Sequence, residues 1–194
     1  VQKALALDDG LADAHATLAF IRFYGDWDWL SADKEFRRAI ELSPSYAQAH
    51  RTYSDFLSEM GRHDQALAEI RTAQELDPLS ATTVLDAGWV FYYAREYDRA
   101  IEQCRKVLEL DPRSVSALDC VGSAHMATAA YDQAIAEYSA LLTSSGNDPL
   151  RLASLGCAYA MAGKKPQAQK VVAQLNEASK IHYVPPYFLG LVHA

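Results

Sequence analysis

The 194-residue sequence has few cysteines and none of the spacings that mark a metal site. Cys104, Cys120 and Cys157 form no Cys-x-x-Cys pair, so three free thiols and, with them, a reducing compartment are expected. Cys120 and Cys157 could approach each other, but spacing along the chain does not decide this. No metal and no cofactor is expected.

Long apolar runs and enzyme motifs are also missing. No segment approaches the roughly 18 apolar residues of a membrane-spanning helix, and the opening VQKALALDDG does not have the pattern of a signal peptide. There is no phosphate-binding glycine loop, HExxH or GxSxG. A net charge of −7 disfavours non-specific binding to nucleic acid. We therefore predict a protein that is not an enzyme, binds neither nucleic acid nor membrane directly, and is cytoplasmic, or periplasmic if it belongs to a membrane-spanning regulator.

What the sequence does contain is a repeat of 34 residues, clearest from residue 47 onward. Small or apolar residues recur at positions 4, 7, 8 and 11 of each unit and again at positions 20, 24 and 27, and each set makes one face of an α-helix. Position 20 is alanine in every complete unit, which lets two helices cross closely. Pro44, Pro78 and Pro112 are expected to end the second helix of their units. Each unit is thus predicted to be a helix hairpin that buries its faces by stacking on its neighbours.

This pattern resembles the tetratricopeptide repeat (TPR) family. The resemblance implies an all-α fold, a right-handed α-solenoid of helix-turn-helix units, with residues 1–194 forming a single array. The expected divisions are the tail of a preceding repeat at 1–11, repeats at 12–46, 47–80, 81–114, 115–148 and 149–182, and the start of a further repeat at 183–194. Both ends should then expose apolar helix faces, which predicts a piece of a longer protein or end-to-end self-association.

In TPR proteins the first helices line a concave groove that takes extended peptides or helices. Carried over to this sequence, the groove predicts a protein or peptide partner held by residues on four first helices: Phe20, Tyr24, Arg51, Asp55, Trp89, Tyr92, Tyr93 and Met126. Trp89, Tyr92 and Tyr93 are the strongest candidates, because three aromatic residues on one short stretch of helix exceed what the core stripe requires. The alternative is that they pack against neighbouring helices. Glu59 also falls at a groove position.

One subtype of the family is disfavoured by the same positions. The members that clamp the carboxylate of chaperone C-termini need Lys and Asn at positions 5 and 9 of one unit. No unit of this sequence has that pair, and Asp55 at position 9 would repel a carboxylate.

Two other features stand outside the groove. Trp27, in the turn of the first full unit, has no equivalent in the other units; it either folds back over the helix pair or is an exposed docking anchor for another domain. His15 and His50 share position 4, a packing position, so they are expected to be satisfied helix-face histidines rather than metal ligands.

The leading prediction is a non-catalytic protein–protein interaction module that binds a peptide or helix in a concave groove, within a longer protein. A finer resemblance supplies an alternative. The segments GDWDW, EFRRAIELSP and YVPPY are similar to repeat arrays of large bacterial signalling proteins. In those proteins the array follows a winged-helix, Ser/Thr kinase or cyclase domain, which implies a regulatory or sensory arm. A third possibility is a scaffold that self-assembles through uncapped ends.

Overall fold

The computed structural model describes residues 1–145, 148–181 and 183–193. Within these ranges the chain forms helices and connecting turns, and no strand. The fold is therefore all-α, as the repeat pattern predicts. The chain divides into two compact units, residues 1–96 and 97–194.

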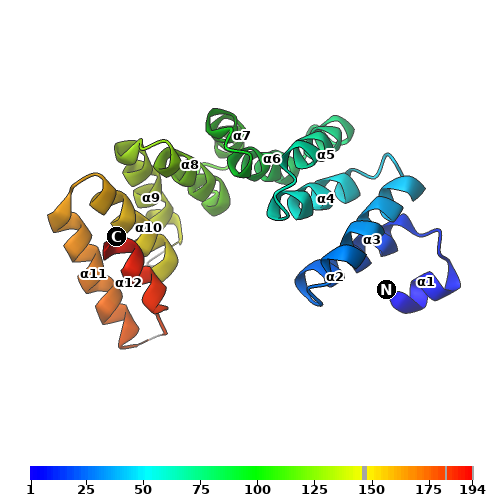
Figure 1. The fold of residues 1–194 in the computed structure, drawn as a ribbon. Coiled ribbons are helices and arrows are strands. Elements are labelled where there is room, and N and C mark those ends of the chain that lie inside the picture. Colours follow the sequence, from blue (N-terminus) through cyan, green and yellow to red (C-terminus); the bar gives the residue numbers. More distant parts are fainter. Residues whose placement is uncertain (146–147, 182, 194) are drawn as a thin grey trace. The chain divides into compact units, whose positions relative to one another are not determined.

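The first unit contains the helices α1 (Gln2–Leu7), α2 (Ala12–Tyr24), α3 (Trp29–Leu42), α4 (Ala47–Glu59), α5 (His63–Leu76) and α6 (Ala81–Tyr93). Successive helices pair: α2 lies along α3, and α4 along α5 (Figure 1). The first helices of successive hairpins also touch, α2 against α4 and α4 against α6. Helices α3 and α5 end just before Pro44 and Pro78, because proline disfavours helical geometry in the residue before it and donates no backbone hydrogen bond.

The core of the first unit is built from aromatic rings and from alanines at the helix crossings. The Phe56 ring centroid lies 5.1 Å from that of Phe23 and 5.6 Å from that of Phe36. Burial of a phenylalanine side chain contributes about 1.5–3 kcal/mol. Ala32 and Ala66, both at repeat position 20, are fully buried. The methyl side chain at this position therefore does lie where two helices meet.

His15 and His50 occupy equivalent buried positions and make equivalent bonds, as expected for packed histidines. The Nδ1 atom of His50 lies 2.6 Å from Glu69 Oε2, and its Nε2 lies 2.9 Å from the Pro44 carbonyl oxygen. The Nδ1 atom of His15 lies 2.5 Å from Glu35 Oε2. Burial opposes the charge on His15, but the bonds to Glu35 and to the backbone outweigh it and raise its pKa. Each histidine ties its own helix pair together and to the turn that precedes it.

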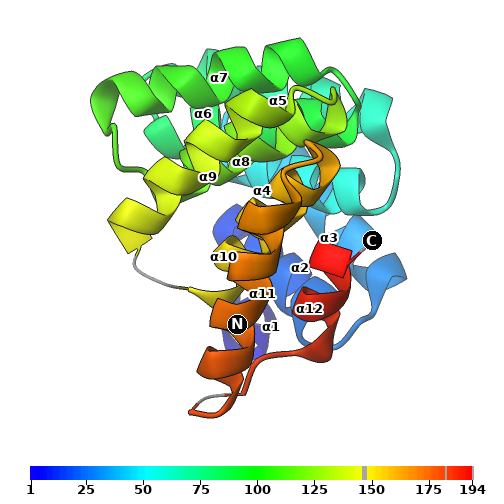
Figure 2. The same cartoon turned by 90° about the vertical axis from the view of Figure 1, so that its left-hand side faces the viewer.

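The second unit contains α7 (Tyr97–Leu110), α8 (Val115–Ala127), α9 (Tyr131–Ser145), α10 (Pro149–Met161), α11 (Lys165–Ser179) and α12 (Pro186–His193). Here α8 lies along both α7 and α9, and α12 lies beside α10 and α11 (Figure 2). Buried aliphatic residues of α10, α11 and α12, among them Leu152, Leu175 and Val192, form one cluster.

A glycine at repeat position 8 lets two helices of the second unit approach closely. A Cβ atom placed on Gly122 of α8 would lie 2.7 Å from Cε1 of Tyr138 on α9. No real Cβ contact is that short, so the aromatic ring occupies the space that any other residue would need. The small residue at this position of the repeat is thus explained by packing.

Candidate functional site

A cleft opens on the first unit where α2, α4 and α6 present their groove positions. Its volume is about 260 Å³, and it is lined by aromatic, acidic and small residues: Tyr24, Asp55, Ser58, Glu59, Asp86, Trp89, Val90 and Tyr93. Four of these, Tyr24, Asp55, Trp89 and Tyr93, are among the predicted site residues. The structure therefore brings together groove positions from three consecutive repeats.

The α2 side of the cleft is formed by Tyr24. Its hydroxyl donates a hydrogen bond to Glu59 Oε1 on α4, with a donor–acceptor distance of 2.9 Å. Burial, followed by this bond, raises the pKa of Tyr24, so the phenol stays protonated at neutral pH. The ring centroid of Phe20 lies 4.8 Å from that of Tyr24. Phe20 is exposed and, although its ring contacts that of Tyr24 at a tilt, it does not line the cleft.

The α6 side carries the three predicted aromatic residues. The Trp89 ring lies edge-on to Tyr92 at 5.6 Å, and the Tyr92 ring lies edge-on to Tyr93 at 5.5 Å, between centroids. Trp89 and Tyr93 line the cleft, whereas Tyr92 does not. Tyr93 is half exposed, while Trp89 is mostly covered and keeps part of its surface accessible. Packing between the rings thus explains part of this aromatic cluster, and the accessible surfaces of Trp89 and Tyr93 face the cleft.

Acidic side chains outnumber basic ones at the base of the cleft. Arg51 on α4 forms an ion pair with Asp86 on α6, so Arg51 is held between two helices and is absent from the cleft lining. Asp55 has no hydrogen bond or ion pair among the described residues. Burial, then the nearby charge of Asp86, raises the pKa of Asp55 to about 7 against the opposing effect of Arg51.

Besides Glu59, three lining residues lie outside the predicted site residues: Ser58, Asp86 and Val90. Ser58 is at a groove position of its repeat, so the register alone could have indicated it. Asp86 and Val90 lie one residue beside groove positions, and their inclusion depends on the angle at which α6 crosses α4. The Ser58 side chain is nearly fully buried, and its Oγ has no hydrogen-bonding partner among the described residues.

Tetratricopeptide repeat family models match residues 47–78 and 85–149, which together make up half of the chain. The chain belongs to the tetratricopeptide repeat family. Members of this family generally act as non-catalytic scaffolds for protein interactions.

Curated relatives share only part of their length with this chain. It is 35% identical over 60 residues to the human protein O-mannosyl-transferase TMTC1, covering 31% of this chain and 7% of TMTC1. It is 33% identical over 75 residues to the type IV pilus assembly protein PilF of Pseudomonas aeruginosa, covering 39% of this chain and 29% of PilF. The chain thus matches less than a third of the length of either relative.

Solved structures share the TPR fold over almost the whole chain. PilF of Pseudomonas aeruginosa aligns with a TM-score of 0.75 at 23% identity, covering 97% of this chain and 84% of PilF. PilW, a type IV pilus biogenesis factor, aligns with a TM-score of 0.88 at 19% identity, covering 100% of this chain and 87% of PilW. At these identities the similarity establishes the fold.

Two other predicted residues lie apart from the cleft lining. Met126 belongs to the second unit, where it packs half-buried against a cluster that includes Tyr138 and Leu155. Trp27 is 71% exposed, and its φ of 56° places it in the left-handed region. The interpretation that Trp27 folds back over the helix pair is therefore wrong, and its possible role as a docking anchor stays a prediction.

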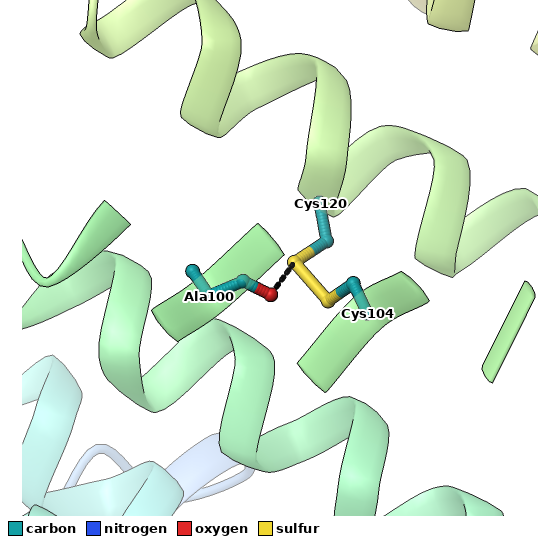
Figure 3. Close-up of a disulfide and its surroundings, with 3 residues drawn as sticks. All are labelled: Ala100, Cys104 and Cys120. Carbon is teal, nitrogen blue, oxygen red and sulfur yellow. Dashed lines mark hydrogen bonds between the residues drawn. A yellow bond between two sulfur atoms is a disulfide. The ribbon is translucent and has the colours of Figure 1, made fainter. Parts of the chain in front are cut away.

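The expectation of three free thiols is wrong. Cys104 on α7 and Cys120 on α8 form a disulfide, with their Cα atoms 6.5 Å apart (Figure 3). Both residues are fully buried, and Cys120 Sγ lies 4.0 Å from the carbonyl oxygen of Ala100. Cys157 is the free cysteine, so the open question of whether Cys120 approaches Cys157 is answered by the pairing of Cys120 with Cys104. A disulfide removes the argument from thiols for a reducing compartment.

The described residues contain neither a helix that could span a membrane nor a cluster of metal-binding side chains. None of their helices has both the length and the apolar character needed to cross a bilayer. Nor do three or more His, Cys, Asp or Glu side chains gather in these ranges as a metal ion would require.

Proposed function

We propose that this chain is a protein-interaction module that binds an extended segment or a helix of a partner protein across α2, α4 and α6. The observation that carries the proposal is the cleft itself, in which Tyr24, Trp89 and Tyr93 from two of these helices converge on one cavity. Aromatic rings supply large contact areas at low entropic cost, and residues of this kind are enriched among those that dominate binding energies.

The surrounding bonds make the cleft a preorganised site. The Tyr24–Glu59 hydrogen bond joins α2 to α4, and the Arg51–Asp86 ion pair joins α4 to α6. A partner would therefore meet a surface whose side chains are already positioned, which lowers the entropic cost of binding. In this proposal Trp89 and Tyr93 provide apolar contact, Tyr92 supports Trp89 from the side, and Asp55 influences the register of the bound segment.

The test is a selection of peptides from a displayed random library by the immobilised 194-residue chain. The affinity of the enriched peptides for the native protein is then compared with their affinity for the double variant Trp89→Ala, Tyr92→Ala. The matched control, Trp27→Ala with Tyr187→Ala, removes the same two residue types from exposed positions outside the cleft. We expect the first variant to lose binding by about a hundredfold and the control to retain it.

Circular dichroism of both variants establishes that helicity is intact, and Tyr93→Ser provides a milder second change at a half-exposed position. Equal binding by the native protein and the Trp89/Tyr92 variant would place the binding site elsewhere. Loss of peptide binding only in the control variant, Trp27→Ala with Tyr187→Ala, would instead support docking through Trp27.

The likeness to PilF favours a setting in which the module serves the assembly of a larger complex. The regulatory arm of a signalling protein and self-assembly through the ends of the array stay predictions. A regulatory arm would change the activity of an attached domain, and self-assembly would make the mass measured by light scattering grow with protein concentration.

A further inference from the structure

The cleft is acidic as well as aromatic, and not all of its acidic groups are paired with a positive charge. Asp55, Glu59 and Asp86 all line it. Asp86 is neutralised by its ion pair with Arg51. Glu59 accepts a hydrogen bond only from the neutral Tyr24 hydroxyl, and Asp55 has no hydrogen bond or ion pair in the described residues. Two carboxyl groups therefore remain available to a cation.

A second observation points independently to a ligand at this place. Ser58 lies between these two carboxyl groups along α4 and also lines the cleft. Its side chain is 95% buried by the fold, yet its hydroxyl has no hydrogen-bonding partner in the described part of the chain. Buried polar groups are nearly always hydrogen-bonded, so this unpartnered hydroxyl beside the cleft is an acceptor that a donor bound there could pair with once the Ser58 side chain turns toward it.

The aromatic lining agrees with a cation more than with an aliphatic side chain. The rings of Tyr24, Trp89 and Tyr93 border the same cavity as the carboxyl groups. A lysine or arginine head within about 6 Å of such a ring is attracted to its electron-rich face. The apolar stem of either side chain packs against the ring at the same time.

The size of the cleft suits one side chain. Sites for whole small molecules usually enclose about 300–1,000 Å³, and this cleft measures about 260 Å³. We propose that the cleft receives one lysine or arginine side chain from the bound partner segment, with Asp55 and Glu59 facing the charge and Trp89 packing against the stem. This inference rests on the proposed function, because it names the chemistry of the segment that the groove binds.

The experiment uses four pools of capped heptapeptides that have random uncharged residues at six positions. The central position carries lysine, arginine, norleucine or glutamate. Each pool is passed over the immobilised full chain in 50 mM salt, and the retained fraction is measured by mass spectrometry. We expect the lysine or arginine pool to be retained about tenfold more than the norleucine pool, and the glutamate pool least.

The decisive comparison uses charge-matched variants. Asp55→Asn with Glu59→Gln removes two carboxylates from the cleft, and Asp13→Asn with Glu75→Gln removes two from exposed positions on α2 and α5. The cleft variant should lose most of the preference for the lysine and arginine pools over the norleucine pool, because only the attraction of the aromatic rings remains. The control variant should keep the preference of the native protein, which separates a local effect from the general attraction of a peptide cation to an acidic chain.

The pH dependence gives a second readout. The groups around Asp55 are Tyr24 from α2, Arg51 and Glu59 from α4, and Asp86 from α6. A cation beside Asp55 stabilises the charged form of this residue. In the cleft without a ligand, burial and the charge of Asp86 raise the pKa of Asp55 to about 7. Binding of a retained lysine peptide should therefore weaken about tenfold between pH 8 and pH 6, and Asp55→Asn should abolish this dependence.

The outcomes distinguish the two proposals. Retention of the norleucine pool at the level of the lysine and arginine pools would overturn the cationic assignment and leave the groove proposal standing. A preference for lysine or arginine that is undiminished in the cleft variant would also overturn it. Failure of the native chain to retain any of the four pools would overturn both the assignment and the binding of short peptides.

Discussion

Replacement of Asp55 by asparagine is expected to stabilise the protein at neutral and higher pH. Burial and the charge of Asp86 raise the pKa of Asp55 from 3.8 to about 7. The folded protein therefore holds a proton on Asp55 between about pH 4 and pH 7, whereas the unfolded chain releases it. Because the folded state binds more protons in this window, its free energy of unfolding falls as the pH rises through it.

The size of the effect follows from the pKa shift. A shift of about three units at about 1.4 kcal/mol per unit sets an upper limit near 4 kcal/mol for the cost of the charged Asp55 above pH 7. Asp55 keeps partial access to the cleft, and solvent and relaxation reduce the cost, so we expect about 2 kcal/mol. Asparagine is neutral and similar in shape. Asp55→Asn should thus equal the native protein near pH 4 and exceed its stability by about 2 kcal/mol at pH 8.

Urea unfolding followed by tryptophan fluorescence measures this difference, because Trp27, Trp29 and Trp89 all lie in the first unit. Asp13→Asn, at an exposed position on α2, is the matched control and should show no such pH-dependent gain. The reasoning is refuted if Asp55→Asn is no more stable than the native protein at pH 8, or if its gain is the same at both pH values.

Two further predictions concern the second unit. Gly122→Ala should destabilise it by about 1–2 kcal/mol, since the clash with Tyr138 outweighs the better helix propensity of alanine. Gly190→Ala meets no atom within 4 Å and should be neutral or slightly stabilising in the same thermal melts; equal effects of the two changes would contradict the packing argument. Reduction of the Cys104–Cys120 disulfide, whose ends lie 16 residues apart, should lower the stability of this unit by about 3 kcal/mol. Titration of the denatured, unreduced chain should find one thiol, and three thiols would contradict the pairing.

The fold was predictable because the same pattern of small and apolar residues recurs in every unit. A stripe that recurs every 34 residues defines helix pairs without any knowledge of distances, and Ala32 and Ala66 are buried where position 20 requires it. The prolines mark helix ends for the same local reason. Trp27 was harder to place. The turn of every full unit contains a residue with positive φ, but only in the first unit is that residue a tryptophan, and there its side chain is exposed.

The site was only partly predictable because it depends on contacts between helices. The repeat register brings Tyr24, Asp55 and Trp89 to one surface, but it does not specify how far α6 is rotated against α4. That rotation places Asp86 in the lining and directs Arg51 to it instead of to the groove.

The disulfide escaped prediction for a related reason. Cys104 lies on a second helix and Cys120 on the following first helix, whereas comparison of first helices alone suggests Cys120 and Cys157. The distance between such positions is set by the packing of α7 on α8, which the spacing of residues along the chain does not give.

The central claim is that partner segments dock in the cleft of the first unit, and NMR of the three tryptophan indole N–H groups tests it most directly. The labelled native chain is titrated with a peptide enriched in the library selection. The account predicts that the signal of Trp89 shifts progressively, while the signals of the exposed Trp27 and of Trp29 stay in place. A shift confined to Trp27, with Trp89 unchanged at saturation, would contradict it.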